Sequence, residues 1–392
     1  MRLGSSGLVV LLGYHLYELT HDPLSLGWLG LAQAAPAIGL MLFGGVVADR
    51  FARQHVALVG RVVFALLCLL LTMTTLLGGR GSALGIYLVA FLVGCANAFA
   101  QPANQGLDAD ELPDGNAVRA ASLLSSATWA AVLLGPVAAS LLFDIVGPAM
   151  TYAALAAFFA ISALVMHSFV PPRPPVHSET TGEGIAVRIT EGLRFVFADQ
   201  LLFGSMALDL FAVFFGGATA LLPVFATDIL HVGPFWFGVL RSAMACGSFL
   251  AMMITMRHPP QARAGLVLHG VIAAFGVAMI VFALSQNFVL SFLALMTAGA
   301  CDGVSMVIRR VLLRFAAPGA IRGRVSAVRM VFISSSNELG DFESGMLAGA
   351  LGAAPAVWIG GAITLCVVAL TAWRAPKLRR LDLIELERQT AA

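Results

Sequence analysis

Charged side chains inside long apolar stretches are the residues of this sequence best placed to do chemistry. Asp209 and Asp302 each lie inside an apolar stretch with few other charges, and Glu338, Asp341 and Glu343 cluster in a third predicted span. An ionised side chain in hydrocarbon costs about 2.5 kcal/mol or more, so such residues are interpreted as functional. Glu338 and Asp341 are three residues apart and share a helix face, where nearby carboxylates raise one another's proton affinity. We therefore take these five acids as candidates for proton coupling.

Arg241, His15 and Tyr17 are the candidates for contact with a substrate or for charge pairing. Arg241 is the one cation that we place inside an apolar stretch and away from its cytoplasmic end, where it could neutralise an acid or bind an anionic group. We interpret Arg309 as an orientation anchor at the membrane surface rather than as a relay residue. The structural alternative is a static buried ion pair for the charged residues and a hydrogen-bonded core histidine for His15.

The composition places these residues in a membrane protein. Of 392 residues, 59% are hydrophobic and 11% are charged, whereas a soluble domain has about 25% charged residues. A soluble enzyme, a nucleic-acid binder and a disordered chain are therefore excluded. The chain has no Gly-Lys-Ser/Thr phosphate loop, no metal-ligand cluster and no C-x-x-C pair, so we expect neither a cofactor nor a metal site, and no ATP-driven pump within this chain.

The apolar stretches predict an all-α membrane protein, because backbone without partners cannot face lipid and alternating strand patterns are absent. Aromatic, Gly and Pro residues divide the chain into about twelve spans, each close to the 20 residues that cross a bilayer. The predicted spans are 4–20, 25–47, 56–78, 83–106, 119–143, 148–169, 200–226, 234–256, 265–285, 288–312, 324–346 and 350–373.

Basic residues predict the orientation, since they concentrate in cytoplasmic loops. One side of the twelve-span arrangement carries Arg50, Arg53, Arg173, Arg188, Arg194, Arg257, Arg263, Arg322, Arg324, Arg374, Lys377, Arg379 and Arg380. Both termini should therefore be cytoplasmic. We expect an N-terminal six-helix bundle over 1–170, a cytoplasmic linker with an amphipathic helix over 171–199, a C-terminal six-helix bundle over 200–373 and a cytoplasmic tail over 374–392.

The two predicted bundles resemble each other in sequence. A shift of 211 residues aligns Pro23 with Pro234, and a shift of 205 aligns Gly94 with Gly299, Gly135 with Gly340, and Gly147 with Gly352. The matches are mostly Gly and Pro, which mark turns and close helix approaches. This pattern indicates a parallel internal repeat, the architecture in which a substrate binds near the middle of the membrane between the repeats.

A short segment between the second and third spans carries a motif. Gly45 permits close helix packing, Asp49 can face the positive end of a neighbouring helix, and Arg50 and Arg53 can anchor at headgroups. The segment resembles the G-x-x-x-D-R-x-G-R-R signature of the major facilitator superfamily, with an alanine in place of the second glycine. The resemblance implies that Asp49 latches the two bundles on the cytoplasmic side, with a partner near Arg324.

Further stretches resemble the branch of that superfamily that contains enterobactin, macrolide and multidrug exporters. They cover residues 16–20, 222–226, 322–328 and 336–345. Gly135 and Pro136 match the core of the family's antiporter signature, although Ala139 and Ser140 stand where that signature has two glycines. Gly135, Pro136 and, through the repeat, Gly340 are expected to permit close helix packing.

Together these features predict a secondary active transporter and not an enzyme. We expect proton-coupled efflux of a small amphipathic molecule, such as a siderophore, a drug or a macrolide, by alternating access. The expected partners are the substrate, protons and the lipid bilayer of the cell inner membrane; we expect a monomer and no nucleic acid. The alternatives are a metabolite or sugar symporter of the same fold, and a membrane receptor or scaffold that does not transport.

Overall fold

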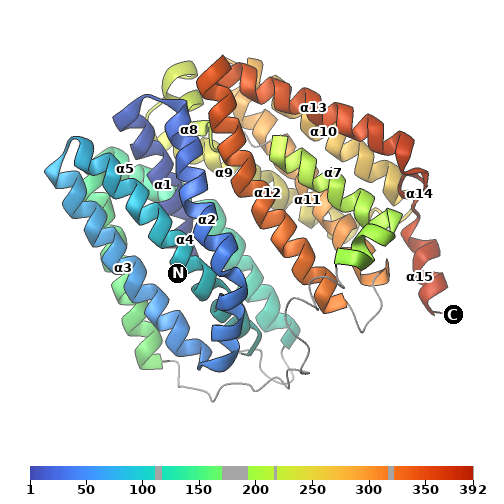
Figure 1. Ribbon diagram of the computed structural model, residues 1–392, viewed down its shortest axis with the longest axis horizontal. Helices are drawn as coiled ribbons and strands as arrows, with labels where there is room; N and C mark the ends of the chain where they lie inside the picture. The colour runs from blue at the N-terminus through green and yellow to red at the C-terminus, as the bar shows by residue number, and fades with distance from the viewer. Residues whose placement is uncertain (111–116, 170–192, 216–218, 317–321, 392) are drawn as a thin grey trace. The chain divides into compact units, whose positions relative to one another are not determined.

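The computed structural model describes residues 1–110, 117–169, 193–215, 219–316 and 322–391, and within these ranges the chain is helical and has no strand (Figure 1). The helices are α1 (Arg2–Thr20), α2 (Pro23–Arg50), α3 (Arg53–Leu77), α4 (Arg80–Asp110), α5 (Ala117–Phe169), α7 (Gln200–Phe215), α8 (Leu222–Val224), the π-helical turn η1 (Phe225–Ile229), α9 (Pro234–Arg257), α10 (Ala264–Leu284), α11 (Phe288–Ala316), α12 (Arg322–Leu351), α13 (Ala353–Arg374), α14 (Pro376–Arg379) and α15 (Leu383–Ala391).

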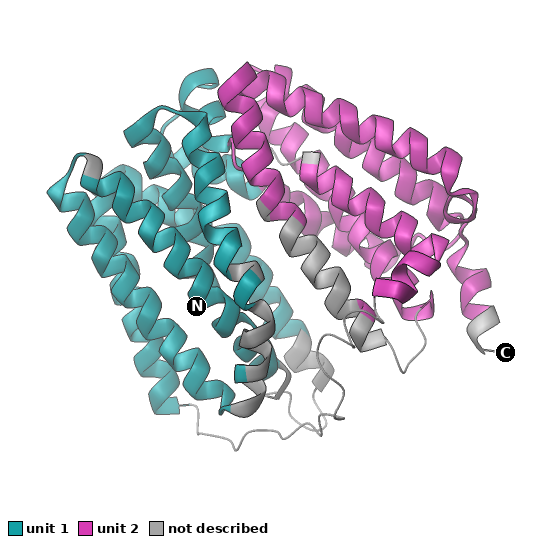
Figure 2. Ribbon diagram, in the orientation of Figure 1, with its two compact units in different colours: residues 1–180, 222–242 teal, residues 181–221, 243–392 magenta. Residues whose placement is uncertain are grey.

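The helices form two compact units, which are coloured separately in Figure 2. Unit 1 comprises Met1–Thr180 and Leu222–Ser242, and unit 2 comprises Thr181–Leu221 and Ala243–Ala392. In unit 1, α4 packs against both α2 and α3, and α5 packs against α1 and α3. In unit 2, α10 packs against α11 and α13, and α7 packs against α12 and α13. The segment 222–242 thus belongs with unit 1, although we assigned it to the C-terminal bundle from the sequence.

The all-helical membrane fold is confirmed, and a helix overlaps each predicted span. Seven stretches of the described residues are long and apolar enough to cross a membrane, so the number of twelve spans stays a prediction. The fifth and sixth spans agree with the structure, because α5 consists of two helices that meet at Gly147. The seventh span is divided between α7 (Gln200–Phe215) and α8 with the π-helical turn η1 (Leu222–Ile229).

Equivalent positions of the predicted repeat adopt the same backbone geometry. Gly147 (φ 79°, ψ 172°) interrupts α5, and Gly352 (φ 92°, ψ 160°) precedes α13. Such positive φ values are accessible to glycine at little cost, so both residues make the sharp reversal between consecutive spans. Gly94 faces Pro36 of α2 so closely that a Cβ would lie 2.8 Å from its ring, and Gly299 faces Met244 of α9 in the same way at 2.6 Å.

The segments that flank α7 and follow α13 pack against unit 2. Residues 193–198 are helical, and Val196 is buried among apolar side chains of that unit; Ile185 and Ile189 of the predicted amphipathic helix lie outside the described residues. The predicted tail continues as α14 and α15, with Leu378 and Leu381 buried in the same core. The chain beyond α13 is therefore part of the folded unit.

Candidate functional site

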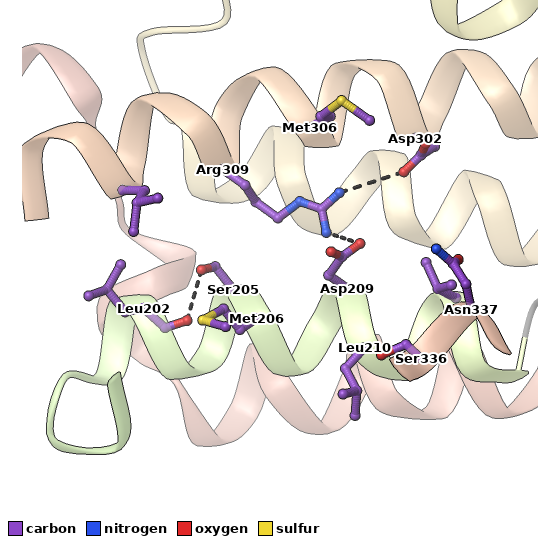
Figure 3. A pocket seen from close by; sticks show the side chains of 12 residues that line it. Leu202, Ser205, Met206, Asp209, Leu210, Asp302, Met306, Arg309, Ser336 and Asn337 are labelled. Carbon is purple, nitrogen blue, oxygen red and sulfur yellow. Dashed lines mark hydrogen bonds and ion pairs between the residues drawn. The ribbon is translucent and has the colours of Figure 1, made fainter. Parts of the chain in front are cut away.

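Helices α7 and α11 of unit 2 bring two acids and an arginine together. Asp209 lies on α7, and Asp302 and Arg309 lie on α11, seven residues apart and therefore on one face of that helix. Figure 3 shows the guanidinium of Arg309 extending between the two carboxylates. Arg309 forms an ion pair with Asp209, and its Nη2 lies 3.6 Å from Oδ1 of Asp302. We call these three residues the charge cluster.

The charge cluster is unevenly exposed. The side chain of Arg309 is 6% exposed, that of Asp209 14% and that of Asp302 34%. Removing charges from water is costly unless they are paired, and the single arginine compensates only one of the two carboxylates. With both acids ionised the cluster carries a formal charge of −1, and it becomes neutral when one acid takes up a proton. Asp302, the more exposed acid with the longer contact, is the better placed to exchange one.

A small cavity adjoins the charge cluster. Its volume is about 150 Å³, and α7, α11 and α12 line it with both polar and apolar side chains. Ser205, Ser336 and Asn337 contribute polar groups, and Met206 and Met306 are among the apolar ones. Sites for drug-sized ligands usually have about 300–1,000 Å³. The cavity therefore has room for a few water molecules or for part of a substrate.

The acids predicted on the eleventh span do not join the charge cluster in the described structure. The side chain of Glu338 lies outside the described residues. Asp341 and Glu343 are half-buried on α12, and neither is among the described residues that line the cavity. Thr219 Oγ1 donates a hydrogen bond of 3.5 Å to Oδ1 of Asp341. Of the five predicted acids, the structure thus brings Asp209 and Asp302 together.

The other predicted substrate residues belong to unit 1. Nδ1 of His15 lies 3.0 Å from the hydroxyl of Tyr152, within hydrogen-bond distance, and His15 is buried. The hydroxyl of Tyr17 donates a hydrogen bond of 2.5 Å to Oδ2 of Asp228, in the π-helical turn η1. Arg241 is half-buried on α9. None of these three residues contributes to the charge cluster.

The predicted packing residues lie at close helix contacts. A Cβ on Gly135 of α5 would lie 2.5 Å from the carbonyl oxygen of Leu3 on α1, and one on Gly340 of α12 would lie 2.7 Å from the carbonyl oxygen of Phe214 on α7. Pro136, beside Gly135, lies inside α5. Both glycines therefore sit where any larger side chain would force the helices apart.

Much of the predicted gating signature falls outside the described side chains. This applies to Gly45, Asp49 and Arg50 near the end of α2, and to Arg324 near the start of α12. Arg53 is described, and its Nη1 donates a hydrogen bond of 3.5 Å to the carbonyl oxygen of Gly106 on α4. The gating roles of these residues stay predictions.

Two arginines were misjudged from the sequence. Arg309 is buried and ion-paired, so its interpretation as a surface anchor is wrong. The spacing of seven residues from Asp302, two turns of one helix, was the signal that could have revealed the pair. Arg61 lies eight residues inside α3, so Arg241 is not the single cation within an apolar helix. Nε of Arg61 donates to Ser162 Oγ at 3.2 Å, and its Nη1 donates to the carbonyl oxygen of Ala57 at 2.9 Å.

The described residues include no metal-binding cluster. No group of three or more His, Cys, Asp or Glu side chains among them could hold a metal ion. The five cysteines are free and distributed over α3, α4, α9, α11 and α13. The charge cluster with its cavity is thus the candidate functional site of the described chain.

Comparison with known proteins identifies relatives among transporters. The multidrug efflux pump Tap of Mycobacterium tuberculosis is 25% identical over 366 residues, covering 90% of this chain and 85% of that protein. The enterobactin exporter EntS of Escherichia coli is 25% identical over 357 residues, covering 90% and 82%.

Solved structures of transporters share the fold. The nucleoside transporter NupG superposes with a TM-score of 0.73 at 15% identity, covering 95% of both chains. A POT family transporter in complex with 5-aminolevulinic acid gives a TM-score of 0.74 at 12% identity, covering 96% of this chain and 94% of that one. The family profile of the Major Facilitator Superfamily matches residues 1–341. The chain is therefore a membrane transporter rather than an enzyme, and it belongs to the Major Facilitator Superfamily.

Proposed function

We propose that this transporter exports a small amphipathic molecule in exchange for protons, with the charge cluster as the coupling site. The observation that carries the proposal is the placement of Arg309 between two carboxylates inside unit 2. One arginine and two acids can exist in two states that differ by one proton. A transporter that couples export to proton entry needs such a pair of states.

The two states differ in what Arg309 can bind. When Asp302 is ionised, Arg309 interacts with both acids and the cluster holds α7 and α11 together by charge. When Asp302 takes up a proton, Arg309 keeps Asp209 as its charged partner, and Asp302 can donate a hydrogen bond into the cavity. A proton taken up at this site therefore changes both the charge and the hydrogen-bonding character of the cavity wall.

The cavity supports an amphipathic substrate. Methionine and leucine side chains form most of its apolar wall, while Asn337 and the two serines provide hydrogen-bonding groups. Methionine is flexible and polarisable and accommodates ligands of varied shape. Because the cavity is small, we propose that it receives only the polar end of a larger substrate. The names of the two curated relatives, a multidrug efflux pump and an enterobactin exporter, support export of drug-like or siderophore-like molecules.

We further propose that the protein works as a monomer in the cell inner membrane, with both termini on the cytoplasmic side. The distribution of arginine and lysine supports this orientation, since basic residues follow α2, α9 and α13. Alternating access would follow from movement of one bundle against the other, which would expose the site first to one side of the membrane and then to the other.

Reconstitution into proteoliposomes tests the proposal. A pH gradient should drive transport of at least one of two probes, ethidium or enterobactin. Movement of the probe in one direction should move protons in the opposite direction, which a pH-sensitive dye trapped inside the liposomes reports. Asp302→Asn and Asp209→Asn should abolish proton movement, while Asp144→Asn, which changes an exposed acid in α5, should leave it intact. The coupling proposal fails if wild type and Asp302→Asn move protons equally.

A further inference from the structure

Unit 1 contains an apolar groove that is not part of the proposed coupling site. The groove lies where α3, α4 and the end of α2 meet, and it has a volume of about 520 Å³. Its wall on α3 includes Val59, Val63 and Leu67, and its wall on α4 includes Cys95 and Ala96. We call this feature the α3–α4 groove.

The sequence of α3 and α4 accounts for the hollow. On α3 the apolar wall recurs every three or four residues, which keeps it on one face of the helix. Gly60 lies at the base of the groove, where a Cβ would be 3.0 Å from Cβ of Ala100 on α4. The helices therefore meet through small residues, and the larger side chains on either side of this contact leave a channel between them.

The length of the groove corresponds to one leaflet of a bilayer. From Val56 to Leu67 the wall rises eleven residues, which is about 16 Å at the helical rise of 1.5 Å per residue. The hydrocarbon core of a bilayer is about 30 Å thick, so one leaflet contributes about 15 Å. An extended acyl chain that enters from one membrane surface would thus fill the groove along its length.

The groove opens towards lipid. Val59, on its wall, is 60% exposed, and the exposed apolar stripe of α3 continues through Val62, Leu66, Leu69 and Met73. Exposed apolar side chains on a helix that is long and apolar enough to cross a membrane are suited to contact with acyl chains rather than water. A lipid chain can therefore enter the groove sideways from the bilayer.

Two basic residues lie near one end of the groove. His55 is exposed and lines the groove, and Arg53 lies two residues earlier at the start of α3, where its Nη1 donates to the carbonyl oxygen of Gly106 on α4. The nearest described acid along α4, Asp108, is ion-paired with Arg2. Among the described side chains, a phosphate group at this end would meet these two basic residues, which favours an anionic headgroup.

We propose that the α3–α4 groove is a binding site for one acyl chain of an anionic phospholipid, whose phosphate lies at Arg53 and His55. The lipid fills the space between α2 and α3, both of which pack on α4 and have little contact with each other. The site lies within unit 1 and includes none of the residues of the charge cluster.

Native mass spectrometry of the full chain in detergent, titrated with phosphatidylglycerol or phosphatidylcholine, tests this site. The wild type should retain one phosphatidylglycerol in preference to phosphatidylcholine. Filling the groove in a Val59→Trp/Ala96→Trp variant should weaken that binding about tenfold or more, the change expected when about two methylene groups stay unburied. Val62→Trp, on the same helix but outside the groove, is the matched control and should bind as the wild type does.

A second variant tests the headgroup and leaves the apolar walls of the groove unchanged. Arg53→Gln should lower the affinity for phosphatidylglycerol to that for phosphatidylcholine, because it removes one positive charge from this end of the groove. The proposal is overturned if the groove-filling variant keeps wild-type binding, if Val62→Trp loses binding to the same extent, or if Arg53→Gln leaves the preference for phosphatidylglycerol unchanged.

Discussion

Replacing Arg309 by glutamine gives the sharpest test of how the charge cluster is held. The substitution leaves Asp209, which is 14% exposed, and Asp302 facing each other without a cation. Breaking a buried ion pair by removing one partner usually costs about 3–5 kcal/mol, because a buried charge loses its compensation. Arg309→Gln should therefore lower the free energy of unfolding by an amount in this range at neutral pH.

The acid variants should lower the free energy of unfolding by less than Arg309→Gln does, and the size of each loss follows from the exposure and contact distance of the acid. Asp209→Asn leaves Arg309 with Asp302, 3.6 Å away. The free energy of unfolding should fall by about the contribution of one charged hydrogen bond, about 1.5–3 kcal/mol. Asp302→Asn removes the more exposed and longer contact and should cost about 1 kcal/mol or less. In the double variant Asp209→Asn/Arg309→Gln a single, partly exposed carboxylate remains, so this variant should be more stable than Arg309→Gln alone.

Unfolding in increasing fractions of SDS, followed by the fluorescence of the five tryptophans, measures these free energies. The double-mutant cycle then gives the coupling energy between Asp209 and Arg309. The reasoning is refuted if Arg309→Gln is no less stable than Asp209→Asn, or if adding Asp209→Asn to Arg309→Gln destabilises the protein further.

Three further predictions concern other contacts. Tyr17→Phe removes the 2.5 Å hydrogen bond to Asp228 and should destabilise unit 1 by about 1.5–3 kcal/mol in the same SDS assay; an unchanged midpoint would show that this bond contributes nothing. Gly340→Val should cost about 1–3 kcal/mol, since its side chain would meet the backbone of Phe214 on α7, and a stable variant would contradict the close helix contact. The backbone N–H of Arg263, followed by those of Ile384 and Glu385, holds the pKa of Asp382 below its ordinary value. The stabilisation of α15 by this carboxylate is therefore present above the ordinary pKa of about 3.9 and is lost as the pH falls through the lower folded pKa. Hydrogen exchange in residues 383–391 should accelerate over that acid range in the wild type but not in Asp382→Asn, and equal pH profiles would disprove the role of Asp382.

The sequence predicted the helical architecture well, because hydropathy and the glycine–proline pattern act locally. Gly147 and Gly352 illustrate this: the internal repeat aligns them as glycines typical of turns, and each has the positive φ that glycine adopts at little cost. The early end of α7 was not predictable from hydropathy, since residues 216–226 are as apolar as the helix before them. Residues 222–242 belong to unit 1, which is a tertiary effect.

The candidate site was predicted only in part. Asp209 and Asp302 were identified because a charge in an apolar stretch is costly wherever it lies. Arg309 was missed because it is followed directly by Arg310, and two adjacent arginines near the end of an apolar stretch are typical of a membrane surface. Whether such a residue turns towards lipid headgroups or towards the core depends on the helix opposite, and the position of α7 relative to α11 is not encoded in either helix alone.

The assignment of residues 222–242 to unit 1 has a consequence for how the protein is made. Within that unit, Phe237 packs against Tyr14 with ring centroids 4.8 Å apart, and Gly238 fits closely against Ser140. The contacts of α1 are thus incomplete until the ribosome has synthesised residues 222–242, which follow α1 by more than two hundred residues. The N-terminal half must wait in the membrane with part of its surface uncovered, and a chain truncated after residue 221 would expose that surface permanently.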